Sequence, residues 1–241
     1  MSGSITLENR FGVNKMELIS LKYAIFVIVL LVLYYCFPKK YRWYVLLAGS
    51  MAYYVIICKW YVLFIIFTIC TTYGSTIWID KLLKEQNAIV KSHKEDWDRQ
   101  TRKEYKEKGR KKRVAVMLFA LLCNFGILAF LKYIPYAGEL GLLLPLGISF
   151  YTFQSMGYVM DVYREIVEPE KNFLKVALFV SFFPQIIQGP IAIYDKLAGQ
   201  LYEGHSLRLE NLQKGALLVL WGVMKKLVIA DRAVNIINFV M

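Results

Sequence analysis

Apolar residues gather into long runs along this chain, and polar or charged residues separate the runs. The first four runs are Leu21–Phe37, Trp43–Cys58, Trp60–Ile79 and Val114–Leu131. A helix of roughly 17 to 25 apolar residues crosses the hydrocarbon core of a bilayer. The pattern therefore predicts four membrane-spanning helices, of which the first is near the lower limit of length.

A strongly charged segment, Asp80–Arg113, separates the third and fourth runs. Residues 81–113 contain 13 Lys and Arg against 6 Asp and Glu, a net charge of +7. Acids and bases are interspersed in this segment, which has no proline and a single glycine, Gly109. We interpret residues 80–113 as a partly helical, solvated loop. Docking of an acidic carrier protein or of anionic lipid remains an alternative.

The placement of positive charge predicts a topology. The cations at 39–42 and the basic segment follow the first and third runs, so alternation puts both on one side of the membrane. Because cytoplasmic loops are rich in Lys and Arg, that side is predicted to be the cytoplasm. Residues 1–18 and Lys59 are then expected outside.

Polar side chains recur at helical spacing in the next apolar stretch. Spacings of three, four and seven residues join Tyr151, Gln154, Ser155 and Tyr158. This spacing predicts a polar helix face. The residues expected on the other faces are Phe150, Phe153, Met156 and Val159.

The run Phe173–Ile193 is long enough to cross a membrane, yet it contains helix-breaking and polar residues. These residues are Pro184, Gln185, Gln188, Gly189 and Pro190. Backbone that proline frees is tolerated at membrane depth only inside protein or beside a cavity. The run is therefore predicted to be a broken helix beside an internal site or passage. The two glutamines have a second interpretation, in which they bridge helices or satisfy the freed backbone.

The last apolar stretch, Gly215–Ala230, is interrupted by Lys225 and Lys226. Its uninterrupted part, Ala216–Met224, is too short to span alone. It is predicted to be an interfacial helix or a bundle helix with lysines that extend to the membrane surface.

Composition agrees with a membrane protein. The 241 residues are 57% hydrophobic, and the mean hydropathy of +0.42 exceeds that of typical soluble proteins. More than half of the net charge of +12 lies in the basic segment between apolar runs. Nucleic-acid binding is disfavoured, because no basic platform interleaved with aromatic residues is present.

Few residues offer acid–base or metal chemistry. The four cysteines form no Cys-x-x-Cys pair and no metal-ligand spacing, so no metal site is predicted. The two histidines, His93 and His205, lie in polar segments and are predicted to be ordinary exposed residues. We therefore expect no catalytic residue in this chain. Asp161 and Arg164 have the spacing of a helical ion pair.

Several unusual phrases occur together in the second half of the chain. They are Pro145–Gln154 (PLGISFYTFQ), Asp161–Arg164 (DVYR), Ser181–Gln185 (SFFPQ) and Gly189–Pro190. In this order they resemble the membrane-bound O-acyltransferase family, above all its alginate O-acetyltransferase membrane subunits. The D-alanine transfer protein of teichoic acid synthesis is a more distant relative. The resemblance extends less sharply from about Met16 to residue 241.

The resemblance implies an all-α, polytopic transmembrane bundle with broken or re-entrant helices in the cell membrane. Family members are roughly twice as long, so residues 1–241 are expected to be the N-terminal half of the domain, with Met1 or Met16 as the start. The family's near-invariant His lies in the other half, so this half alone is expected to be inactive.

The implied reaction carries an acetyl group from a cytosolic donor through a tunnel in the membrane. No tightly bound cofactor is implied; the donor is acetyl-CoA or a carrier-protein thioester. The expected partners are membrane lipid, an acyl carrier or an extracytoplasmic acetyltransferase, and a polysaccharide acceptor.

Candidate residues of the tunnel come from the two marked stretches. They are Ser149, Tyr151, Gln154, Tyr158, Asp161, Arg164, Pro184, Gln185, Gln188 and Gly189. Three alternatives stay open at this point: D-alanyl transfer to teichoic acid, a transporter or permease subunit, and a non-catalytic membrane fragment. Transporters also place broken helices at the midplane of the membrane.

Overall fold

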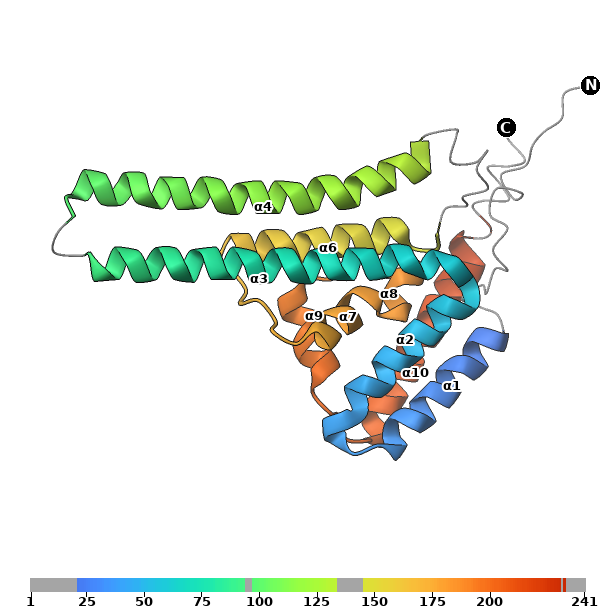
Figure 1. The fold of residues 1–241 in the computed structure, drawn as a ribbon. Helices are drawn as coiled ribbons and strands as arrows, with labels where there is room; N and C mark the ends of the chain where they lie inside the picture. Colours follow the sequence, from blue (N-terminus) through green and yellow to red (C-terminus); the bar gives the residue numbers. More distant parts are fainter. Residues whose placement is uncertain (1–20, 94–96, 134–144, 231, 233–241) are drawn as a thin grey trace, which may run out of the picture. The chain divides into compact units, whose positions relative to one another are not determined.

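The computed structural model describes residues 21–93, 97–133, 145–230 and 232; of Ile187, Gln188 and Ala230 it describes the backbone alone. Every regular element of the described residues is a helix (Figure 1), so the predicted all-α class is confirmed. Two stretches are long and apolar enough to cross a membrane, Lys39–Ser92 and Arg99–Tyr133. The described residues form two compact units, a larger one within Trp43–Glu203 and a smaller one from Leu21–Arg42 and Gly204–Ala230.

The larger unit begins with two helices from the second and third apolar runs, α2 (Arg42–Cys58) and α3 (Val62–Ser92). The short 3-10 helix η3 (Lys59–Tyr61) separates them, and Lys59 has a positive φ of 47°. The predicted boundary at Lys59 is therefore confirmed. A charged residue between two apolar runs favours a turn here, where its ammonium group reaches water.

The charged segment, predicted to be a partly helical loop, is helical up to Ser92 and again from Arg99. Helix α3 continues from its apolar part to Ser92, and α4 (Arg99–Tyr133) begins before the fourth apolar run. The two helices form a long hairpin (Figure 1). Lys, Glu, Arg and Gln are good helix formers, and the segment contains no proline that would end a helix.

Helix α6 (Ile148–Tyr163) lies along this hairpin, and the short helices α7 (Phe173–Ser181), α8 (Phe183–Gln188) and α9 (Tyr194–Tyr202) follow it (Figure 1). The core of the unit lies where these elements meet. Ile65, Met156 and Phe179 from α3, α6 and α7 are at most 1% exposed.

Small hydroxyl side chains line the buried face of α3, a feature that the sequence analysis missed. The buried members are Thr68, Thr72, Ser75 and Thr76. Asn124 Nδ2 on α4 donates to Thr71 Oγ1 at 2.9 Å and so joins the two helices of the hairpin. Small and hydroxyl-bearing residues allow close approach of helices in a membrane, where apolar burial gives no preference for helix contact over lipid.

The smaller unit contains α1 (Leu21–Cys36), the 3-10 helix η2 (Lys39–Tyr41), α10 (Leu209–Met224) and the π-helical segment η4 (Lys225–Ala230). The Arg42 guanidinium lies 5.3 and 5.1 Å from the ring centroids of Tyr34 and Tyr35. Its Nε donates to Phe37 O at 2.9 Å. The α-helix ends at Met224, so the predicted interruption at Lys225 is confirmed as a change from α- to π-helix.

Candidate functional site

The predicted broken helix is confirmed. Helix α7 ends at Ser181, and Phe182, with φ −59° and ψ 105°, turns the chain into α8. Pro184 is the second residue of α8. N–H groups in the first turn of a helix have no partner within the helix, so the proline costs α8 no hydrogen bond. In a continuous helix the proline ring would instead clash with the carbonyl of Val180, four residues earlier. The proline therefore explains a break that lies two residues before it.

Two polar side chains satisfy the backbone groups that this break frees. A continuous helix would pair the Phe183 N–H with the Phe179 carbonyl. Instead, Gln154 Nε2 on α6 donates to Phe179 O at 2.9 Å, and the Phe183 N–H donates to Ser50 Oγ on α2 at 3.4 Å. Both side chains are buried. Ser50 was missed as a site residue, although a serine inside an apolar run was a visible signal.

The predicted polar face of α6 is buried as a whole. Tyr151, Gln154, Ser155 and Tyr158 are each at most 3% exposed. Ser155 Oγ donates to Tyr151 O at 2.6 Å, and the Glu170 N–H donates to Tyr158 Oη at 2.8 Å. The face therefore points into the protein.

The apolar residues of α6 divide between its two sides. Phe150 and Phe153 are on the exposed side, as predicted. Met156 and Val159, which were also expected away from the polar face, are fully buried, and that expectation is wrong. The buried side of α6 is wider than a polar stripe because α3, α4, α7 and α8 all contact this helix.

Three buried oxygens around the interrupted helix have no hydrogen-bond partner within 3.5 Å among the described residues: Tyr54 Oη on α2, Tyr151 Oη on α6 and Gln185 Oε1 on α8. The Tyr54 and Tyr151 rings pack edge to face, with centroids 6.3 Å apart. A buried polar group without a partner costs about 1–3 kcal/mol, so such groups are uncommon and call for an explanation. The group therefore contains two hydroxyl donors and an amide acceptor inside the core.

The other predicted tunnel residues do not all lie together. Ser149 is in the first turn of α6, whereas Asp161 and Arg164 lie at its opposite end. Sixteen residues of helix extend about 24 Å, so one small site cannot include both ends. Gly189 follows α8 in extended conformation, and the side chain of Gln188 lies outside the described residues.

The ion pair at the far end of α6 also differs from the prediction. Among the described residues, Arg113 Nη1 pairs with Glu165 Oε1 at 2.8 Å, and Asp161 is not paired with Arg164. The observed pair ties α4 to the segment that follows α6. Arg113 is the last cation of the basic segment, and it is buried.

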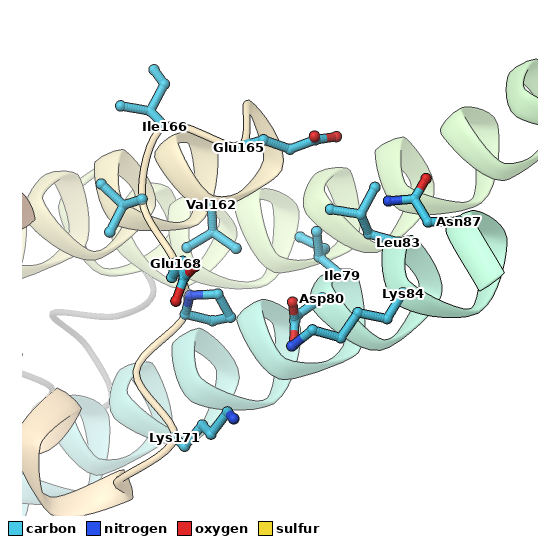
Figure 2. Close-up of a pocket in the computed structure, with 12 residues that line it drawn as sticks. Ile79, Asp80, Leu83, Lys84, Asn87, Val162, Glu165, Ile166, Glu168 and Lys171 are labelled. Carbon is cyan, nitrogen blue, oxygen red and sulfur yellow. The ribbon is translucent and has the colours of Figure 1, made fainter. Parts of the chain in front are cut away.

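A cleft of about 560 Å³ opens beside this ion pair, between α3 and the segment that joins α6 to α7. Figure 2 shows Asp80 and Lys84 of α3, which form an ion pair, across from Glu168 and Lys171 of that segment. Apolar side chains complete the wall. They are Ile79, Leu83, Val162, Ile166, Val167 and Pro169.

Two tyrosines of α9, which lies outside the two candidate membrane-spanning stretches, contact the start of α7 and helix α6. Tyr202 Oη donates to Lys175 O at 2.8 Å, and Lys175 Nζ lies 3.6 Å from Glu170 Oε2. The Tyr194 ring stacks on Tyr158 with centroids 4.1 Å apart. Burial raises the pKa of Tyr194 to about 12 and the pKa of Tyr202 further, so both hydroxyls stay protonated near neutral pH.

Both histidines are exposed, as predicted. The His93 ring stacks on Trp97, with centroids 4.9 Å apart, at the end of the hairpin. His205 belongs to the smaller unit, where its backbone carbonyl accepts a hydrogen bond from Arg42.

Comparison with known proteins gives relatives of one chemical class. Over 37% of its own length, the chain is 40% identical to the probable alginate O-acetylase AlgI of Pseudomonas syringae pv. tomato. Over 37% of this chain, it is 38% identical to the probable alginate O-acetylase AlgI of Pseudomonas aeruginosa. Over 51% of this chain, it is 30% identical to the peptidoglycan O-acetyltransferase of Helicobacter pylori.

The resemblance to membrane-bound O-acyltransferases is confirmed. The matched part spans only 17% to 31% of the length of these relatives. No family model matches the chain. No solved structure matches it.

Proposed function

We propose that this protein is part of a multi-pass O-acetyltransferase of the cell membrane that transfers acetyl groups to hydroxyls of a polysaccharide outside the cytoplasm. Relatives named for O-acetyl transfer to alginate or peptidoglycan support the reaction class. The observation that carries a role for this chain is the interrupted helix α7–α8 with unpartnered buried oxygens around it. A plain membrane anchor has no need of either feature.

The donor in this proposal is a cytosolic acetyl thioester, either acetyl-CoA or a carrier-protein thioester. The acceptor hydroxyl oxygen attacks the thioester carbonyl; a C–O ester bond forms, and the C–S bond breaks. The hydroxyl proton is transferred to the departing thiolate, so the products are an acetate ester and a thiol. Such a step needs a general base, a role that we assign to no residue of this chain.

The residues of this chain are proposed to bind and orient the acyl group. Tyr151 and Tyr54 supply hydroxyl donors, and Gln185 supplies an amide, at depths where a charged residue would be costly. Gln154 and Ser50 keep the interrupted helix in place around them. These are positioning and binding roles.

Deletion and complementation in the native host test the reaction. The O-acetyl content of cell-surface polysaccharide and peptidoglycan is measured as acetate released by mild alkali. We expect deletion to lower this acetate and the intact gene to restore it. Unchanged acetate in both polymers would overturn the proposal. Loss of ester-linked D-alanine instead would favour D-alanyl transfer.

Tyr151→Phe tests the proposed site, because it removes only the hydroxyl. That hydroxyl has no hydrogen-bond partner within 3.5 Å among the described residues, so the variant should fold nearly as well as the wild type. If the oxygen contacts the acyl group, O-acetylation should fall about 5- to 30-fold, as the loss of one to two kcal/mol implies. Tyr133→Phe, which alters an exposed tyrosine, is the matched control. Equal activity of both variants would exclude a role for Tyr151.

A further inference from the structure

A groove of about 350 Å³ lies between α3 and α4 in the charged half of the hairpin. Three lysines of α4 line it: Lys108, Lys111 and Lys112. Leu82 and Ile89 of α3 form an apolar wall. This groove is separate from the cleft of Figure 2, which other residues of α3 line.

The hairpin is held closed beneath the groove. Gln86, which is 5% exposed, donates from Nε2 to the Lys106 carbonyl at 2.8 Å. A Cβ atom on Gly109 would lie only 2.5 Å from Gln86 Cδ, so the glycine allows the amide to cross between the helices. The groove is thus a fixed surface feature rather than a gap between independent helices.

The lysines of the groove are not neutralised by acids. Lys108, Lys111 and Lys112 form no ion pair with any residue that the structure describes. The groove's acid, Glu85, lies 3.9 Å from Lys81 Nζ. Three ammonium groups around one concave surface therefore favour an anion there.

The groove begins next to the apolar part of both helices. Leu82 is three residues beyond Ile79, and Lys112 is two residues before Val114. At 1.5 Å per residue, its lower end is about 5 Å from the apolar stretches. The headgroup region of each leaflet is roughly 5–8 Å thick, so in a membrane-spanning hairpin this end lies among headgroups.

We propose that this groove binds an anionic phospholipid, with its phosphate against Lys108, Lys111 and Lys112. Leu82, at the end of the groove nearest the apolar stretches, would contact the glycerol and the first acyl carbons. The apolar wall and the depth favour a lipid over a soluble phosphate compound. The inference does not depend on the acetyltransferase proposal, because it concerns the hairpin alone.

The test is a titration of the purified protein in neutral detergent with short-chain phosphatidylglycerol, monitored by thermal unfolding. We expect saturable stabilisation that short-chain phosphatidylcholine does not give. The triple variant Lys108→Gln, Lys111→Gln and Lys112→Gln should bind about a hundredfold more weakly, because each cation near anionic lipid contributes about fivefold. Glutamine retains helix propensity, and all three side chains are exposed, so the variant should fold.

The matched control removes the same charge from the same hairpin outside the groove: Arg99→Gln, Lys103→Gln and Lys106→Gln, all exposed positions. It should weaken binding less than fivefold. Equal weakening by both triple variants would show that the lipid is attracted by the overall positive charge of the hairpin and not by the groove, and would overturn the proposal. Absence of saturable phosphatidylglycerol binding would also overturn it.

Parallel titrations with coenzyme A and inorganic phosphate distinguish the source of the phosphate. If either binds through these lysines and phosphatidylglycerol does not, the lipid assignment is wrong. Native mass spectrometry of the wild type and both variants gives a second measurement, the retention of co-purified anionic lipid. If the groove triple variant fails to fold, Lys111→Gln alone replaces it, with an expected loss of about fivefold.

Discussion

Gln154 illustrates how one side chain can stabilise a broken helix. Its amide donates to the Phe179 carbonyl at 2.9 Å, across 25 positions of sequence. In a low-dielectric environment that carbonyl has no water to replace the lost helical partner. One of the predicted tunnel residues therefore also has a structural role.

We predict that Gln154→Leu destabilises the protein by about 1–3 kcal/mol, because it leaves the buried Phe179 carbonyl without a partner. The measurement is unfolding in detergent. Ser155→Ala is the matched control, since Ser155 Oγ donates to a helical carbonyl that already accepts a backbone hydrogen bond. Its expected cost is about 1 kcal/mol or less. Equal losses for the two variants would show that Gln154 has no special role in the break.

Gly147 fixes the start of α6 against α8. Its φ of +71° is left-handed, and a Cβ atom there would lie 2.2 Å from Ile186 Cγ2 and 2.4 Å from Ile186 O. Gly147→Ala should therefore cost at least about 1–2 kcal/mol from the backbone alone, with a further cost for displacing α8.

Gly157→Ala provides the opposite case in the same helix. Nothing lies within 4 Å of a Cβ atom at Gly157, and its backbone is helical. Alanine there should be neutral or stabilise by up to about 1 kcal/mol. Thermal unfolding of both variants measures the difference. A Gly147→Ala protein as stable as Gly157→Ala would contradict the close packing of α6 on α8.

At the scale of elements, the hairpin of α3 and α4 depends on the close approach at Gly109. Gly109→Ala should push the Gln86 amide away from Lys106 O and loosen the charged half of the hairpin. Gly126→Ala, in the apolar half of α4, meets nothing within 4 Å. We expect faster amide hydrogen exchange in residues 84–92 and 99–110 for Gly109→Ala only. Equal exchange in both variants would contradict this account.

The sequence predicted the elements better than their ends. Hydrophobic runs located α1, α2 and the apolar parts of α3 and α4, because burial in lipid or protein follows composition directly. It underestimated the helix in Asp80–Arg113, which was predicted to be only a partly helical loop although the residue types favour helix. Propensity was the better guide there, since a hairpin lets charged residues face water without ending either helix.

Contacts between distant elements were not predictable. The polar face of α6 followed from spacing, but the partners of that face did not. The Ser50 Oγ that accepts from the Phe183 N–H is 133 positions away in sequence. The cleft of Figure 2 likewise joins Asp80 to Glu168, from segments that no periodicity relates. Such pairings depend on packing, which a single sequence does not specify.

At the scale of the molecule, the positive-inside argument still sets the expected orientation. The structure changes how it must be tested. Gln86, at the middle of the basic segment, is 5% exposed and hydrogen-bonded, so a cysteine there would react poorly on either side of a membrane. Ala88, two residues on, is exposed. The N-terminal 20 residues lie outside the described residues, whereas Lys59 between α2 and α3 is described and exposed.

We predict that Lys59 faces the outside and Ala88 the cytoplasm, because α3 between them contains the apolar run of a membrane span and Lys and Arg are enriched on cytoplasmic sides. In a variant without its four native cysteines, Lys59→Cys should react with an impermeant thiol reagent on intact cells. Ala88→Cys should react only after permeabilisation. Lys103→Cys, an exposed position on α4, should behave like Ala88→Cys, since the hairpin places both helices on one side. Labelling of Ala88→Cys but not Lys59→Cys on intact cells would invert the topology and move the proposed lipid groove to the outer leaflet.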